Sequence, residues 1–229
     1  MAIVRLDFSD TRPANSGSGD SRDQPTILPL PAGEGRGEGE SPGRSERSAS
    51  LKMSRIQNFP VPAETVAQLC PQCALCCNGV LFKDVELQPG DSAAKLKKLG
   101  LPVSDKRIAK FPQPCAALEG CACRIYGEHP ARCRDFECLL LKSVAAGERS
   151  PEAALRVIRD AKTRAQKVTR LLRDLDDRDE QKALSLRFKR TQRRLEVSGY
   201  DNERAETFGE LTLAVHHLNL ILREQFYPG

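Results

Sequence analysis

The C-terminal part of the chain carries apolar residues at spacings of three and four positions, with charged residues between them. The residues that follow this spacing are Leu155, Ile158, Ala161, Ala165, Val168, Leu172 and Leu175. Such spacing places apolar side chains in a stripe along one face of an α-helix. Ser150 can cap the first turn, and Pro151 suits the first helical position. The pattern therefore predicts an amphipathic helix that starts at Ser150.

Two further helices are predicted after this one. The first covers about Glu180 to Val197 and ends at Ser198-Gly199, and the second runs from about Asn202 to Phe226. The last helix carries on one face Leu211, Val215, Leu218 and Leu222. Short connections favour antiparallel neighbours, so residues 150–229 are expected to form an arm of two or three antiparallel helices.

The middle of the chain, residues 53–145, shows only short runs of regular pattern. We expect a helical turn at Ala63–Leu69, a strand at Val80–Phe82 and a short helix in DSAAKLKKLG that ends at Gly100. A segment with such short elements needs cross-links, such as disulfides or bound metal, in order to fold. The predicted fold is mainly α, with a small irregular α+β cysteine-rich module held by metal and the C-terminal antiparallel helices packed on it.

The N-terminal residues differ from the rest. Pro31 to Ser50 contains no Val, Leu, Ile, Phe or Tyr, so it cannot bury enough apolar surface to offset the entropy of ordering. We predict that residues 1–52 are a disordered low-complexity tail. Met53 is the only methionine besides Met1, and ordinary-looking sequence follows it, which suggests that translation starts at Met53.

Composition narrows the class of protein. The 229 residues carry a formal charge of +5, and acidic residues nearly match basic ones, which disfavours nucleic acid as a partner. No apolar run reaches the roughly 18 residues of a membrane-spanning helix, and MAIVRLDFSD does not resemble a signal peptide. We therefore predict a cytoplasmic protein without a membrane partner. Basic side chains on the helices are interpreted as a solvated face.

All nine cysteines lie between positions 70 and 138, and four of them fall within CPQCALCC at residues 70–77. Disulfides are rare in a reducing compartment, and ordinary buried cysteines would be scattered through the core. A catalytic thiol needs one basic partner and does not call for eight further cysteines. Metal binding explains the crowding best, because C-x-x-C directs two sulfurs toward one ion.

The spacing also indicates how metals are shared. The side chains of adjacent Cys76 and Cys77 diverge, so they serve different metals or opposite sides of one cluster. Four thiolates complete a tetrahedral site, so eight fill two sites and leave one cysteine spare. Four thiolates around one divalent ion carry two net negative charges, which Arg124, Arg132 and Arg134 are placed in the sequence to offset.

CPQCALCC, PCAAL and CRIYGEHPARCRDFEC together resemble the CxxCxxCC cysteine-cluster family, the YkgJ-type zinc- or iron-chelating domain. The resemblance covers about Cys70 to Leu141 and leaves Cys121 as the extra thiol. It implies as metal ligands Cys70, Cys73, Cys76, Cys77, Cys115, Cys123, Cys133 and Cys138. The family usually has arginine where this chain has His129, which we interpret as a surface or supporting residue. His216 and His217 are interpreted as packing or solvent-facing.

The family resemblance implies a metal site and says little about a reaction. Flagellin lysine N-methylases carry a related cysteine cluster, but this chain has no methyl-donor motif, so their activity is not carried over. The favoured function is metal binding, with an Fe–S cluster or zinc as cofactor and a protein partner bound through the C-terminal helices. The alternatives are an Fe–S enzyme of oxidoreductase or protein-lysine-methylase-related type and a zinc-stapled nucleic-acid-binding module. Whether the protein is an enzyme stays open.

Overall fold

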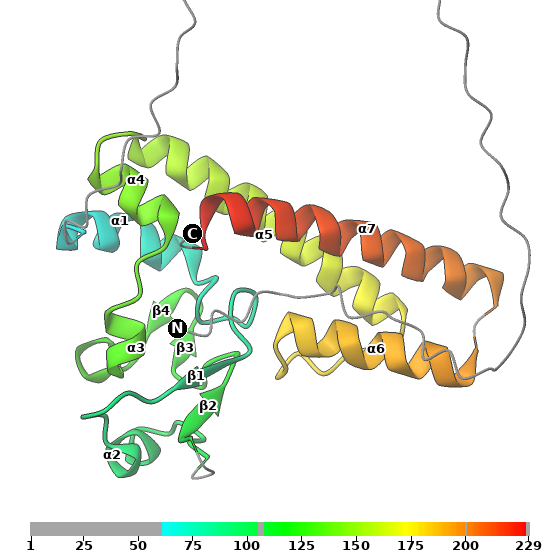
Figure 1. The fold of residues 1–229 in the computed structure, drawn as a ribbon, viewed down its shortest axis with the longest axis horizontal. Coiled ribbons are helices and arrows are strands. Elements are labelled where there is room, and N and C mark those ends of the chain that lie inside the picture. The colour runs from blue at the N-terminus through cyan, green and yellow to red at the C-terminus, as the bar shows by residue number, and fades with distance from the viewer. Residues whose placement is uncertain (1–60, 105–107, 200, 228–229) are drawn as a thin grey trace, which may run out of the picture. The chain divides into compact units, whose positions relative to one another are not determined.

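The computed structural model describes residues 61–104, 108–199 and 201–227, which belong to one compact unit of the chain (Figure 1). The predicted tail at residues 1–52 lies outside these described residues. Within them, no helix is both long enough and apolar enough to cross a membrane.

The described part of the chain is mainly helical, as the sequence predicts. Its helices are α1 (Ala63–Cys73), α2 (Ala93–Lys98), η1 (Tyr126–Glu128), α3 (Ala131–Arg134), α4 (Leu139–Ala145), α5 (Pro151–Asp174), α6 (Leu184–Ser198) and α7 (Asn202–Gln225). Its strands are β1 (Asp84–Glu86), β2 (Lys110–Pro112), β3 (Leu118–Glu119) and β4 (Ala122–Cys123). β1 pairs with β2 and β3 with β4, both antiparallel.

The long helices α5 and α7 start at the capping residues that their sequences offer. Ser150 Oγ accepts a hydrogen bond from the amide of Ala153 at 3.2 Å, and Pro151 occupies the first turn of α5. α7 matches its predicted bounds within one residue and is capped by Asp201. Contacts between α5 and α7 run in opposite chain directions, because Arg164 donates to the carbonyl of His217 whereas Lys167 pairs with Glu210. The predicted antiparallel packing is therefore confirmed for this pair.

The predicted start of the next helix, Glu180, is wrong by four residues. α6 begins at Leu184, and the side chain of Asp177 ties the preceding loop to this helix. That carboxylate accepts hydrogen bonds from Arg187 Nε at 2.9 Å and from Arg190 Nη2 at 2.7 Å. The first amide of α6, on Leu184, donates to the carbonyl of Gly79 at 2.9 Å. The start of α6 is thus joined to the loop that follows the clustered cysteines.

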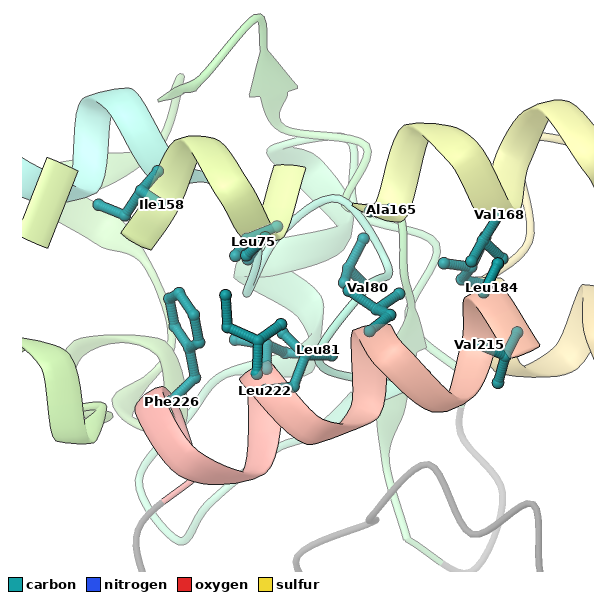
Figure 2. Close-up of a cluster of buried hydrophobic side chains, with 14 of the residues drawn as sticks. Leu75, Val80, Leu81, Ile158, Ala165, Val168, Leu184, Val215, Leu222 and Phe226 are labelled. Atoms are coloured by element: carbon teal, nitrogen blue, oxygen red, sulfur yellow. The ribbon is translucent and has the colours of Figure 1, made fainter. Parts of the chain in front are cut away.

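The main apolar core is shared by the cysteine-rich segment and the long helices. Figure 2 shows Leu75, Val80 and Leu81 among side chains of α5 and α7, which include Ile158 and Leu222. The strand predicted at Val80–Phe82 is therefore wrong: Val80 and Leu81 pack into the helical core instead. The first strand, β1, begins two residues after the predicted segment.

A second, smaller apolar cluster lies within the cysteine-rich segment itself. It contains Val85, Leu96, Leu101, Val103, Phe111, Ala117 and Ile125. α2, which contributes Leu96, is the short helix that the sequence predicts, and Gly100 follows it at a φ of 88°. Its first turn is capped by Ser92. The cysteine-rich segment thus contacts two apolar clusters, one shared with the helices and one of its own.

Candidate metal centre

The first two cysteines lie on the last turn of α1, which ends at Cys73, four residues beyond its predicted end at Leu69. Cys70 and Cys73 are three positions apart, so they share one face of the helix. The helix ends at Ala74, whose backbone takes the left-handed conformation (φ 58°) while its amide donates to the carbonyl of Cys70. This break redirects the chain before Cys76.

The next two cysteines lie in a compact turn. The amides of Cys77 and Asn78 both donate to the carbonyl of Ala74 at 2.9 Å. Gly79 follows with a φ of 81°, and the amide of Leu81 returns to the carbonyl of Leu75 at 3.0 Å. The turn therefore fixes the backbone around the adjacent pair Cys76 and Cys77.

Two distal cysteines approach this turn from the β3–β4 hairpin and the segment before it. The amide of Cys115 donates to the carbonyl of Cys77 at 2.8 Å, which places the two backbones side by side. Cys123 lies on β4 opposite Leu118 of β3. Cys121 lies between the strands, in the hairpin turn. Backbone pairing across about 40 residues thus brings Cys115 to the clustered cysteines.

The last two cysteines lie on the short helices α3 and α4. Cys133 is on α3, which is anchored where the amide of Ala131 donates to Asp91 Oδ1 at 2.9 Å. Cys138 caps α4, and its Sγ accepts a hydrogen bond from the amide of Leu141 at 3.4 Å. Cys138 is buried in the core that also contacts Cys70, Cys73 and Cys76.

Mutual electrostatic effects define a first thiol set, which comprises Cys70, Cys73, Cys76 and Cys138. Burial raises the pKa of Cys70 to about 11 and that of Cys73 to about 12, and the charge of Cys138 adds to both rises. Burial also raises the pKa of Cys76 well above its usual value, and the charges of Cys73 and Cys138 raise it further. Like charges raise each other's pKa only at short range, so these four thiols are neighbours.

The same effects define a second thiol set, which comprises Cys77, Cys115, Cys123 and Cys133. Burial raises the pKa of Cys77 to about 12, and the charges of Cys115 and Cys123 add to the rise. Burial raises the pKa of Cys133 to about 12 as well, with further effects from Cys77, Cys115 and Cys123. Three members of this set pack against the smaller apolar cluster rather than the main core.

The boundary between the two sets falls between adjacent residues. Cys76 interacts mainly with the first set, and Cys77 interacts mainly with the second. Weaker effects cross the boundary, because Cys77 acts on Cys76 and Cys70 acts on Cys77. The grouping divides the eight predicted ligands into two groups of four. That Cys76 and Cys77 serve different metals, or opposite sides of one cluster, stays a prediction.

All nine cysteines are free thiols in the structure. Within the described ranges, no three Cys, His, Asp or Glu side chains stand in the geometry of a metal-ligand group. Each thiol set is therefore a neighbourhood of donors, and its side chains would have to turn toward a common point to hold an ion. The donor chemistry fits a soft or borderline metal, since thiolates bind zinc and iron.

Cys121, the thiol that the family resemblance leaves over, lies beside a lysine of α5. Its Sγ lies 3.5 Å from Nζ of Lys162, which also donates to the carbonyl of Gln72 at 3.1 Å. The charge of Lys162 opposes the rise in the pKa of Cys73 that burial causes. Sequence reasoning missed Lys162, because nothing in the α5 pattern distinguishes it from the other basic residues of that helix.

The charged and imidazole side chains near the thiols have distinct surroundings. The charge of Arg124 opposes the rise in the pKa of Cys115 that burial causes. Arg134 instead pairs with Asp135 at 3.3 Å. The ring of His129 stacks on Tyr126, with centroids 4.9 Å apart. Its role as a surface or supporting residue stays a prediction.

His216 and His217 are exposed on α7, as one of the two interpretations of these residues held.

Comparison of the chain with protein-family models, curated proteins and solved structures found no match. The resemblance to the CxxCxxCC family therefore stays a prediction that rests on the cysteine pattern.

Proposed function

We propose that this chain is a metal-binding protein in which eight cysteines form two thiolate centres for zinc or iron. The observation that supports it is the division of the eight thiols into the first and second thiol sets, four in each. Four cysteine thiolates are the complete ligand set of a structural zinc site and of an Fe–S cluster. The proposal also places the protein in a reducing compartment such as the cytoplasm, where nine free thiols persist.

The residues proposed as ligands are Cys70, Cys73, Cys76 and Cys138 for one centre and Cys77, Cys115, Cys123 and Cys133 for the other. A bound metal would supply positive charge that favours the thiolate form, and an iron cluster would add one-electron redox chemistry. Metal binding at the thiols whose pKa is raised by burial is expected to release protons. These thiols are Cys70, Cys73, Cys76, Cys77, Cys115, Cys133 and Cys138. The charge of Arg124 acts on Cys115, and the charge of Lys162 acts on Cys73; both favour the thiolate form.

The test is metal analysis of protein purified without oxygen, together with its absorption spectrum. We expect either zinc at two ions per chain or a brown protein whose broad absorption near roughly 400 nm bleaches with dithionite. Colourless protein that carries zinc would assign the centres to zinc, whereas protein without bound metal would refute the proposal.

Single substitutions test the division into two sets. Cys138→Ser is expected to remove about half of the bound metal, and Cys133→Ser is expected to remove the other half. Cys121→Ser is the matched control, because it removes a thiol from the same segment and is expected to leave the metal content unchanged. Unchanged metal in both Cys138→Ser and Cys133→Ser would contradict the assignment of ligands.

A further inference from the structure

The exposed side of α7 carries a second regular pattern besides the one that faces the core. The core side, which packs along α5 (Figure 1), buries residues such as Leu218 and Leu222. On the other side, exposed residues recur at alternating spacings of three and four positions. These residues, called here the outer stripe, are Glu206, Gly209, Leu213, His216, Leu220 and Arg223. The contact positions of a coiled coil have the same spacing, which lets one helix pack lengthwise on another.

Both leucines of the outer stripe are exposed to solvent. Leu213 is 60% exposed and Leu220 is 42% exposed. They lie seven positions apart, so they project from the same face of α7. Single exposed leucines are common on protein surfaces, and the meaning of this pair depends on the residues around it.

The glycine of the outer stripe has no packing role among the described residues. Gly209 lies inside α7, where glycine is less favourable than alanine because it has more freedom to lose when the chain folds. None of the described residues comes within 4 Å of a Cβ added at this position, apart from its own neighbours in the helix. A missing side chain on an exposed helical face lets another helix approach closely. Gly209 therefore supports a partner that packs directly on the outer stripe.

The two ends of the outer stripe carry opposite charges. Among the described residues, neither Glu206 nor Arg223 forms an ion pair. By contrast, Glu210 beside the stripe pairs with Lys167 at 2.8 Å. The stripe is thus acidic near the start of α7 and basic near its end, and both of these charges are available to a partner.

A second copy of α7 complements these charges when the two helices run antiparallel. Glu206 of one copy then faces Arg223 of the other, and two-fold symmetry repeats this ion pair at the other end of the interface. A parallel two-fold pair would instead place Glu206 against Glu206 and Arg223 against Arg223, which is unfavourable. The charges therefore favour a second copy in the antiparallel direction.

The same alignment also matches the residues between the charged ends. Because the spacing along the stripe is the same when it is read in either direction, Leu220 faces Gly209 of the other copy, and Leu213 faces His216. A leucine then enters the space that the glycine leaves, as a side chain enters a hole in a coiled coil. The alignment thus covers both exposed leucines of each copy.

We propose that this chain forms a homodimer in which the outer stripe of α7 packs antiparallel on the outer stripe of a second copy. The same surface is used by both copies, so the assembly closes at two chains. One helix pair makes a small interface, and we expect a weak dimer with a dissociation constant of about 10–100 µM. The inference goes beyond the proposed metal-binding function, because it concerns a face of α7 that holds none of the proposed ligands.

The experiment is sedimentation equilibrium of the full chain, with its metal, from roughly a tenth to ten times the expected dissociation constant. We expect a monomer–dimer equilibrium. Leu220→Gln is expected to raise the dissociation constant about tenfold, because each dimer loses two covered leucines. The matched control is Leu186→Gln, since Leu186 is 41% exposed on α6 and lies outside the outer stripe. It is expected to leave the dissociation constant unchanged.

Further variants test the direction and the closeness of the helix pair. Arg223→Glu is expected to weaken the dimer about tenfold, and adding Glu206→Arg to it is expected to restore the dimer, because both ion pairs then form with reversed charges. Gly209→Ala is expected to weaken the dimer but to raise the urea midpoint of the chain at concentrations where it is monomeric, because alanine favours the helix. These opposite effects distinguish a contact between copies from a folding defect.

A chain that stays monomeric over the whole range would overturn the inference. Equal dissociation constants for Leu220→Gln and Leu186→Gln would overturn it as well, and so would a double charge reversal that leaves the dimer as weak as Arg223→Glu alone. Assemblies larger than a dimer would contradict the closed, symmetric interface. Metal content is measured separately on every variant, so failure of the metal proposal and failure of this one are distinguishable.

Discussion

Gly79 follows the adjacent cysteines by two residues, and substitution by alanine tests how tightly their turn is packed. Its φ of 81° lies in the left-handed region, where a side chain costs about 1–2 kcal/mol. A Cβ at this position would lie 3.0 Å from Cα of Ala183 and 3.2 Å from Cδ of Pro114. Ala183 precedes α6 and Pro114 precedes Cys115, so the new methyl group would push against two segments that hold the turn.

The contact part of the cost can be separated from the backbone part. Gly147 has a φ of 71°, and a Cβ added there would meet nothing within 4 Å. Gly147→Ala therefore carries only the backbone cost, together with the small gain from a less flexible unfolded chain. Gly79→Ala carries both of these and an overpacking cost of about 1–3 kcal/mol. We expect Gly79→Ala to be the more destabilising of the two by that amount.

The measurement is urea denaturation of both variants and the unchanged chain at equal metal content, followed by circular dichroism. A lower midpoint at an unchanged slope reports the loss of stability directly. Equal midpoints for Gly79→Ala and Gly147→Ala would refute the close approach of the turn to Ala183 and Pro114. Lower metal content in Gly79→Ala alone would further link this approach to the placement of the thiols.

Other parts of the structure give sharper or simpler tests. Asp177→Ala leaves the buried guanidinium of Arg187 without its partner and is expected to cost about 3–5 kcal/mol, whereas the double change with Arg187→Met should recover much of that loss in thermal denaturation. Tyr227→Phe removes the hydrogen bond from its hydroxyl to the carbonyl of Leu81 and is expected to cost about 1–2 kcal/mol by urea denaturation. Leu222→Ala empties a fully buried site in the shared core, and a loss below about 2 kcal/mol would contradict that packing. Removal of metal by a chelator is expected to increase proteolysis of the cysteine-rich segment while the long helices keep most of their circular dichroism.

Sequence periodicity predicted the parts of the fold that local rules determine. The stripe of α5, its Ser150 cap and the apolar face of α7 all depend on residues within a few positions of one another. The strand predicted at Val80–Phe82 was wrong because a short apolar segment is equally compatible with a strand and with a buried turn. The ion pair that ties the loop before α6 to the helix, between Asp177 and Arg187, joins residues ten positions apart and could not be read from local rules.

In the candidate site, too, some features follow from the local sequence and others from residues far apart in the chain. The cysteine pattern identifies the eight thiols, but it leaves open which of them meet. Their grouping depends on long-range packing that places Cys138 beside the end of α1 and Cys115 beside Cys77. The contact of Lys162 with Cys121 spans 41 residues, and its contact with Gln72 spans 90. No local pattern carries that information.

The division of the sets between Cys76 and Cys77 has a consequence for the order of assembly. The chain segment from Cys77 to Cys133 lies wholly inside the segment from Cys76 to Cys138. Closing the inner segment therefore shortens the path that joins the ends of the outer one. Gathering the outer set first would close a loop of about 60 residues. Once the inner set has formed, the remaining path between Cys76 and Cys138 is only about six residues long, and the entropic cost of closing it falls by about 2 kcal/mol. The second thiol set is therefore expected to form first and to bring the ligands of the first within reach.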